Sequence, residues 1–154
     1  LSVYGRDDRS RIVDPADRSR VFAWLICETR DDKGNVILYD YRREDGVDLD
    51  LTQAHEAHRG SATDERRGAN RYIERIRYGN ATTLLASDSS LRPATLSQAQ
   101  IDGTRWMFEI AFDYGTADDQ RPDVVAPWTR RDDPFSTYRA GFEIRTYRLC
   151  RRVC

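Results

Sequence analysis

The feature that most constrains this chain is the alternation of apolar and charged residues along five long segments. In the clearest segment, residues 105–114, every second position is a bulky apolar residue: Trp106, Phe108, Ile110, Phe112 and Tyr114. Alternation with a period of two is typical of strands that have one buried and one wet face. The sequence therefore predicts a mainly β fold built on an antiparallel sheet of long strands, with one or two short helices in loops.

The other four segments are residues 21–29, 36–41, 71–78 and 141–153. The first two are separated by Asp31-Asp32-Lys33-Gly34-Asn35, in which Gly34 is placed to take the left-handed conformation of a short hairpin loop. We therefore expect residues 21–29 and 36–41 to pair as an antiparallel hairpin.

The same alternation gives an expectation for the core. The four alternate residues from Trp106 to Phe112 should line it together with Trp24 and Leu25.

The last segment, residues 141–153, reaches the end of the sequence without a terminating turn. A strand there would leave its sheet unfinished, with Arg148, Arg151 and Arg152 pointing outward. We therefore expect residues 1–154 to form a single β-rich segment that is an incomplete piece of a larger domain.

The connections between these segments are polar or rich in proline. Asp50 and Gln53 have the spacing of a capping box, and Gly60 would close a short helix over residues 51–59. Residues 116–139 contain Pro122, Pro127 and Pro134, which prevent regular strand pairing there.

Composition excludes several classes of protein. Of the 154 residues, 39% are hydrophobic, and the Trp, Tyr and Phe residues supply core material that disordered chains lack. A formal net charge of −1 argues against a nucleic-acid platform. Apolar runs are all too short for a membrane span. Cys27, Cys150 and Cys154 include no CxxC pair, which argues against a disulfide framework or a zinc site.

Candidate catalytic and metal-binding motifs are incomplete. His55 and His58 are three residues apart, whereas a zincin helix needs a spacing of four, and no third ligand is evident. The acidic stretch 45–50 lacks the central Gly and distal Glu of a calcium loop. Hydroxyl residues at 87–90 and 136–138 lie in no Gly-x-Ser-x-Gly elbow, and the chain has no P-loop. The sequence therefore predicts no catalytic, cofactor-binding or metal-ligating residue.

Trp128 has two interpretations. It could cap a partner surface or stack on a sugar, which would make the proline-rich loop a carbohydrate- or protein-binding module. We favour the alternative that the ring folds back over the edge of the sheet, as a tryptophan in such a loop more often does.

Several strings, taken in order, carry a resemblance to a known family. They are Tyr4-Gly5-Arg6, residues 11–15, Trp24-Leu25 with 31–35, residues 71–80, residues 108–115, residues 133–143 and residues 147–153. In this order they resemble the SpvB-type N-terminal region of bacterial toxins. That family includes the B component of insecticidal Tc toxin complexes and the Salmonella virulence plasmid B protein.

The resemblance implies a structural role in a secreted toxin complex. It implies a shell related to Rhs/YD-repeat proteins, in which this β structure helps to enclose and deliver a cytotoxic C-terminal enzyme. The implied partners are the rest of the toxin polypeptide, the pore-forming A component and the C component with its toxic domain. ADP-ribosyltransferases in the family use a Glu-x-Glu pair, which is absent from this sequence, so the resemblance implies no enzyme activity for this chain.

Overall fold

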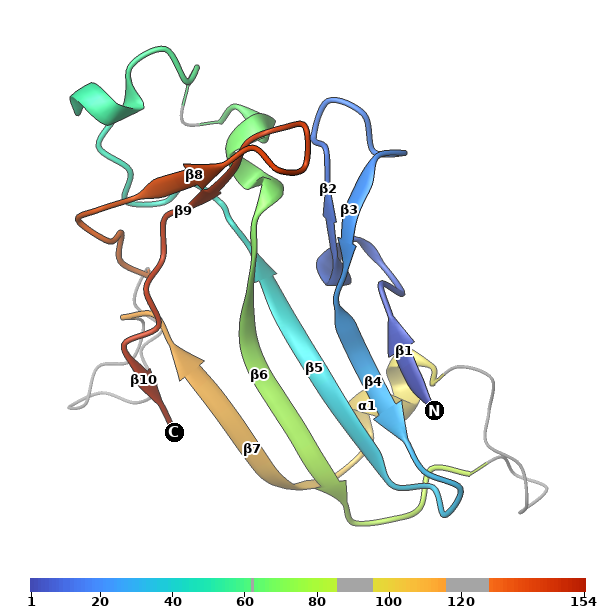
Figure 1. Ribbon diagram of the computed structural model, residues 1–154. Coiled ribbons are helices and arrows are strands. Elements are labelled where there is room, and N and C mark those ends of the chain that lie inside the picture. Colours follow the sequence, from blue (N-terminus) through green and yellow to red (C-terminus); the bar gives the residue numbers. More distant parts are fainter. Residues whose placement is uncertain (62, 86–95, 116–127) are drawn as a thin grey trace.

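The computed structural model describes residues 1–154 except for 62, 86–95 and 116–127. Its main element is a six-stranded sheet in the order β1-β4-β5-β6-β7-β10, in which every neighbouring pair is antiparallel (Figure 1). The strands are β1 (Ser2–Tyr4), β4 (Ile26–Arg30), β5 (Val36–Arg43), β6 (Arg71–Asn80), β7 (Trp106–Asp113) and β10 (Arg152–Val153). The prediction of a mainly β fold with an antiparallel sheet is confirmed.

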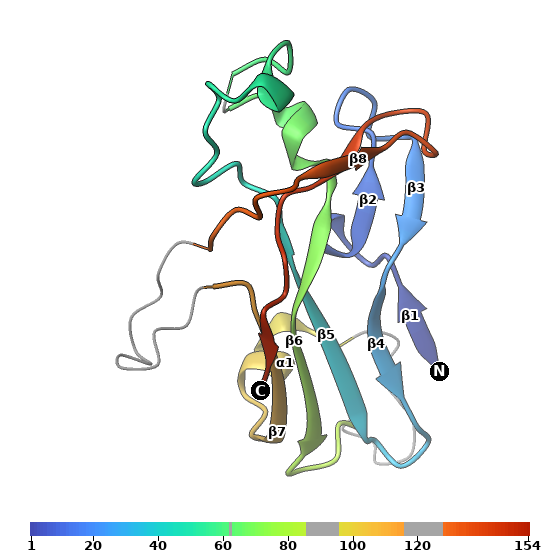
Figure 2. The same cartoon turned by 60° about the vertical axis from the view of Figure 1, so that its left-hand side comes forward.

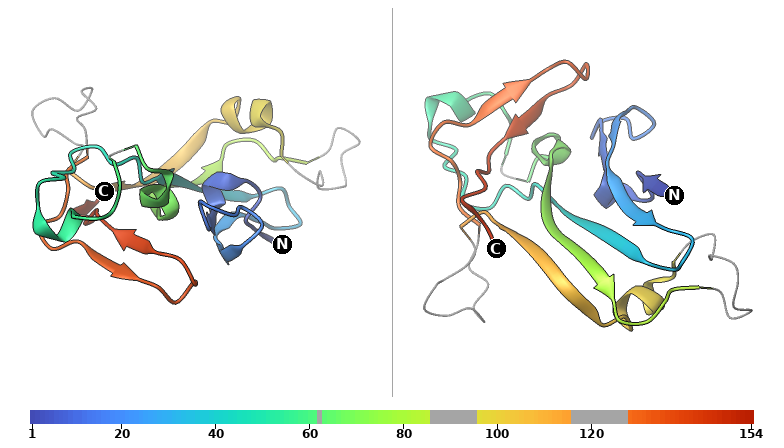
Figure 3. Two further views of the ribbon diagram at one scale, coloured as in Figure 1. Left: turned by 90° about the horizontal axis from the view of Figure 1, so that it is seen from above. Right: turned by 60° about the horizontal axis from the view of Figure 1, so that its bottom comes forward.

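Two small two-stranded sheets lie together beside one end of the main sheet (Figures 1 and 2). They pair β2 (Arg11–Val13) with β3 (Val21–Trp24), and β8 (Phe135–Thr137) with β9 (Ile144–Thr146). The expectation that residues 116–139 form no regular pairing is therefore wrong for β8, which begins directly after Pro134. The helical elements are short: η1 (Asp8–Ser10), η2 (Ala54–Glu56), η3 (Glu65–Ala69) and α1 (Gln98–Asp102). Seen from above, α1 and the β8–β9 hairpin lie on opposite sides of the main sheet (Figure 3).

The predicted hairpin is present, although its first strand is divided. Gly34 has a φ of 82°, and the Asp31 carboxylate closes the turn by accepting hydrogen bonds from the backbone of Lys33 and Asn35. The expected strand 21–29 breaks at Leu25, whose backbone N–H donates to the Ser10 carbonyl at 2.8 Å. Its first half pairs with β2 and its second half with β1 and β5, so one apolar run serves two sheets.

The predicted strands over residues 71–78 and 105–114 are present as β6 and β7. β6 and β7 pair along most of their length, with Ile76 opposite Ile110 and Tyr78 opposite Phe108.

The prediction of a single strand over residues 141–153 is wrong. Only Ile144–Thr146 and Arg152–Val153 are strands, and they belong to different sheets. Between them the Tyr147 backbone N–H donates to the Tyr72 hydroxyl at 2.9 Å, and the Arg148 side chain turns inward to Glu44. These long-range side-chain bonds replace the regular strand pairing that alternation alone would predict.

The expected helix over residues 51–59 is also wrong in its extent. The predicted capping box is absent: Asp50 accepts a hydrogen bond from the Thr52 backbone, but Gln53 precedes η2 and makes no side-chain cap bond. Only the three residues of η2 follow as a 3₁₀ turn. His58 and Gly60 have φ values of 66° and 74°, in the left-handed region, which a continuing helix does not allow.

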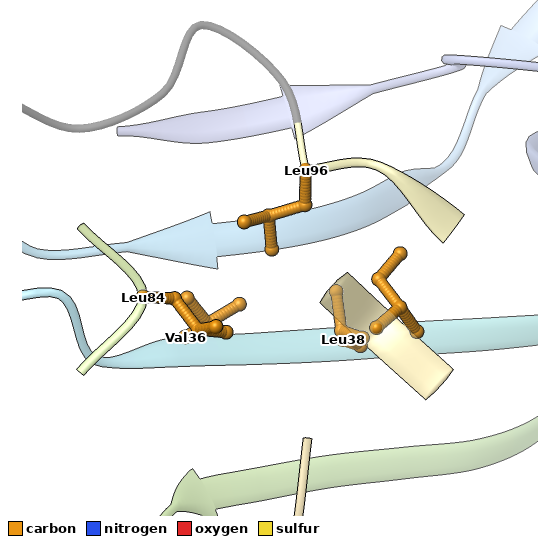
Figure 4. Close-up of a cluster of buried hydrophobic side chains, with 5 residues drawn as sticks. Val36, Leu38, Leu84 and Leu96 are labelled. Carbon is orange, nitrogen blue, oxygen red and sulfur yellow. The ribbon is translucent and has the colours of Figure 1, made fainter. Parts of the chain in front are cut away.

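Two apolar clusters form the core of the described residues. The first contains Val36, Leu38, Leu84, Leu96 and Ile101, with Trp106 packed against it, and Figure 4 shows the first four. The second consists of the Tyr72, Tyr114 and Trp128 rings, which pack edge to face with centroids 5.3–6.1 Å apart. Phe112 packs against this second cluster.

The predicted core is therefore only partly correct. Trp106 packs on the first cluster, but Phe108 is 53% exposed and Trp24 is 56% exposed. For Phe108 the reason is the position of α1, whose Ile101 covers the face of the main sheet that carries Leu38. Trp24 lies in the separate β2–β3 sheet. Phe108 lies on the face that α1 leaves free.

Candidate interaction site: a charged interior and an open apolar face

The two histidines do not meet a third metal ligand. His55 Nε2 lies 3.8 Å from a Glu56 carboxylate oxygen, and His58 lies on the lining of a cleft described below. In the parts of the chain that the structure describes, no group of three His, Cys, Asp or Glu side chains is arranged to hold a metal ion. Hydroxyl residues 87–90 lie outside the described residues.

Trp128 folds back into the protein, as we favoured from the sequence. Its side chain is buried, and its indole Nε1 donates a hydrogen bond to Asp45 Oδ1 at 2.8 Å. The guanidinium groups of Arg42 and Arg148 lie 3.9 and 4.4 Å from the ring centroid. A ring that is covered in this way cannot stack on a sugar, and residues 116–127 of the same loop lie outside the described part.

Arg148 points inward, contrary to the prediction for strand 141–153. Both it and Glu44 have side chains with no exposed surface, and Arg148 Nε donates to Glu44 Oε2 at 2.9 Å. The same guanidinium also donates to the backbone carbonyls of Trp128 at 3.0 Å and Val47 at 2.8 Å. Arg151 and Arg152 are exposed as expected, and Arg152 pairs with Asp113 at 3.0 Å.

A second buried carboxylate, Glu56, joins three segments of the chain. It accepts hydrogen bonds from Arg67, from Arg145 Nε at 3.0 Å and from the Tyr147 hydroxyl at 2.8 Å. Burial by itself would raise the pKa of Glu56, but the bonds from Arg67 and Tyr147 and the charge of Arg145 lower it below its usual value. Burial, together with the hydrogen bond to Glu56, raises the pKa of Tyr147 to about 12.

Glu28 forms a third cluster of the same kind. Its side chain has no exposed surface and pairs with Arg6 and Arg30. In all three clusters a buried carboxylate is matched by guanidinium groups, without which its burial would be strongly unfavourable. The first two clusters join residues that are about 90 to 100 positions apart in the sequence, which suits them to holding loops against the sheet.

A cleft of about 460 Å³ lies between the β2–β3 turn, residues 57–67 and the β8–β9 hairpin. Tyr138 and Phe142 contribute rings to its lining, and Arg145 contributes a guanidinium group. Arg59 and Glu143, which also line it, form an ion pair. The cationic groups of this cleft are thus largely neutralised within the protein.

One face of the main sheet carries an uninterrupted apolar strip. Tyr39, Ile76 and Ile110 are aligned across β5, β6 and β7, and Tyr78 and Phe108 form the next row. The last two rings stack, with centroids 5.2 Å apart and planes at 22°. We call these five residues the open face. Because side chains alternate along a strand, the side chains of the open face and those of Leu38, Arg77 and Glu109 lie on different faces of the sheet.

Little of the described structure covers this strip. Tyr78 is 36% exposed and Phe108 is 53% exposed, and the other three side chains are half-buried. In Figure 1, α1 lies behind the sheet, and no described element crosses in front of the lower half of β5, β6 and β7. The open face is therefore a candidate interaction surface.

The structure defines a mainly β domain with buried ion pairs, and comparison with known proteins identifies its family. The model of the SpvB family, described as Salmonella virulence plasmid 65kDa B protein, matches residues 1–154. The chain belongs to this family.

Individual relatives agree with that assignment. The mono(ADP-ribosyl)transferase SpvB of Salmonella typhimurium strain 14028s is 36% identical over 158 residues, which cover 99% of this chain and 24% of the relative. The N-terminal domain of the effector protein SpvB from Salmonella typhimurium strain LT2 superposes with a TM-score of 0.78 at 36% identity. That match covers 99% of this chain and 45% of the solved one.

Structures of Tc toxins also match over nearly the whole chain. The crystal structure of TcdB2-TccC3 gives a TM-score of 0.73 at 31% identity, and the Photorhabdus luminescens Tc holotoxin pore gives 0.73 at 29%. Each match covers 99% of this chain and 7% of the larger one. The chain thus spans about a quarter of the length of its curated relatives. None of the helices in the described residues is long and apolar enough to cross a membrane.

Proposed function

We propose that this chain is a structural segment of a toxin-delivery protein and forms part of the wall of a shell around a cytotoxic C-terminal enzyme. The observation that carries the proposal is the match of 99% of the chain, at 31% identity, within the TcdB2-TccC3 structure. The region matched in SpvB lies in its N-terminal domain.

The interior of the domain supports a structural role. Glu28, Glu44 and Glu56 are each held by arginine side chains and are not free to act as an acid or base. Such clusters fix the positions of loops, which suits a wall that must keep its shape. We propose accordingly that the chain has no catalysis of its own and needs no cofactor.

The partners that follow from this role are other parts of a toxin complex. They are the rest of the chain's own polypeptide, a pore-forming A component and a C component that carries the toxic domain, in a secreted complex. With a net charge of −1, nucleic acid is not among the expected partners.

Protease protection tests the shell. In the full-length polypeptide that carries this chain, the C-terminal enzyme should resist digestion under conditions that degrade the same enzyme expressed alone. Removal of residues 1–154 should abolish that resistance, whereas Arg151→Ala, an exposed change, should leave it intact. If the enzyme is digested equally fast inside the full-length polypeptide and alone, the shell proposal is wrong.

A further inference from the structure

The open face has the reverse of the polarity expected for a solvated sheet surface. An antiparallel sheet can expose one face to water when that face carries polar residues. Here Arg75 and Glu109 form their 3.3 Å ion pair on the face that also carries α1, while the uncovered face presents Phe108 and Ile110. The apolar strip is therefore placed for a contact that the described residues do not make.

The chemistry of the strip restricts what can bind to it. Its five side chains are two isoleucines, two tyrosines and one phenylalanine, with no charged group among them. A highly charged partner would lose hydration over these five side chains and would find only Glu74, which alternates with Ile76 on the same face of β6, to pair with. The strip requires an apolar partner surface.

The size of the strip favours a tethered partner. Fully buried aromatic side chains cover about 150–250 Å² each, so further burial of three half-exposed rings and two isoleucines removes roughly a few hundred Å² from water. A stable interface between separate proteins needs about 800 Å² on each partner. A segment of the same polypeptide can bind over a smaller area because its effective concentration is high.

The relatives contain enough additional polypeptide to supply such a segment. This chain aligns over 99% of its length but covers only 45% of the solved SpvB N-terminal domain. We propose that a second β layer, supplied by the same polypeptide outside residues 1–154, packs on the open face. Like the proposed function, this inference requires that the chain be part of a larger polypeptide. It does not depend on the shell or on the enclosed enzyme.

Thiol labelling in the full-length polypeptide tests this proposal. In a background with Cys27, Cys150 and Cys154 replaced by Ser, and any other cysteines likewise removed, we would compare Phe108→Cys with its neighbour Glu109→Cys. The second is a matched control, since residue 109 lies on the opposite face of the same strand. Maleimide should label Phe108→Cys at least about tenfold more slowly than Glu109→Cys, because a packed interface blocks the reagent. Equal rates would overturn the proposal.

Two further measurements apply if the cysteine variants do not fold or if a second copy of the chain covers the open face. If the substitutions prevent folding, hydroxyl-radical footprinting of the unsubstituted polypeptide should show Tyr78 and Phe108 protected relative to Tyr138, which is 62% exposed. Equal modification would contradict the second layer. If Phe108→Cys is protected in the 154-residue chain alone, and more so at higher concentration, a second copy covers the face and the proposal is wrong. Protease protection of the enzyme can fail while residue 108 remains protected, so the two proposals can be rejected separately.

Discussion

The segment from Ile144 to Arg148 buries two arginines, whereas the neighbouring strands β6 and β7 leave Tyr78 and Phe108 exposed. By residue type alone the opposite arrangement would be expected. The difference lies in the available partners: Arg145 and Arg148 reach buried carboxylates, while α1 packs on the other face of the sheet from Phe108. Burial in this protein is thus decided by contacts between distant segments rather than by local pattern.

The comparison also separates two structural tasks. The charged interior joins the C-terminal segment to the loops that contain Glu44 and Glu56. The open face makes no comparable contact within the described residues and is available for packing against something else. The first region should therefore be sensitive to substitution in the chain alone, and the second only in a larger polypeptide.

The largest loss of folding stability is expected when the fully buried ion pair between Arg148 and Glu44 is broken. Arg148→Met leaves Glu44 as an unpaired charge and should lower the free energy of unfolding of the chain by about 3–5 kcal/mol. Urea denaturation measures this loss. Arg151→Ala, at an exposed position of the same segment, is the matched control and should change stability by less than about 0.5 kcal/mol.

A double substitution sharpens the same comparison. Replacement of both partners, Glu44→Leu with Arg148→Met, removes the buried charges together and should cost less than Arg148→Met alone. If the double variant is the less stable of the two, the loss reflects packing and backbone bonds rather than an unpaired charge.

A smaller loss of folding stability is expected when the hydroxyl of Tyr147, a neutral member of the Glu56 cluster, is removed. The Tyr147 hydroxyl donates to Glu56 and accepts from Arg67 at 2.7 Å, and Tyr147→Phe removes both bonds without changing the ring. We expect a cost of about 1–3 kcal/mol, as for an unsatisfied buried group. Tyr138→Phe, at an exposed hydroxyl, should be near neutral by the same denaturation assay, and equal losses would contradict the cluster's role.

The charged interior should also make stability depend on pH. The pKa of Glu56 is lowered in the folded protein, so its ionised form stabilises the fold fully above the unfolded value of about 4.3. This contribution is lost as pH falls below that value toward the folded pKa. The stability difference between the wild type and Glu56→Gln should therefore narrow between pH 6 and pH 3, with both monitored by denaturant midpoint; a constant difference would show that Glu56 does not titrate as described.

The smallest effect is expected on the open face. Phe108→Ala should cost less than about 1 kcal/mol in the 154-residue chain, as for a surface position. The alternation of the sequence had predicted a core residue there, with the loss of about 3–5 kcal/mol typical of a buried aromatic. A loss in that higher range would show that Phe108 is packed within the chain itself.

The sequence predicted the parts of the fold that depend on local pattern. The hairpin around Gly34 and the strands β6 and β7 follow from alternation and from the turn residues. The division of the strand at Leu25 and the course of residues 147–151 were not predicted, because they depend on bonds to Ser10, Tyr72 and Glu44 that are distant in sequence.

The candidate site was harder to predict than the fold. Alternation shows that Phe108 and Glu109 lie on opposite faces, but it cannot show which face a short helix such as α1 will cover. Charged residues such as Glu44 and Arg148 carry no sequence signal of burial, since each reads as a solvated residue until the other is placed beside it. For Trp128, the preference of tryptophan for partial burial was a sufficient signal.

The most direct test of the account is an electron cryo-microscopy map of the full-length polypeptide that carries this chain. If a second β layer covers the open face, the map should show protein density about 10 Å from the sheet over Ile76, Phe108 and Ile110, the usual spacing of packed sheets. Arg148 should also remain paired with Glu44 in that map. Solvent over Phe108 and Ile110 in the assembled protein would contradict the account.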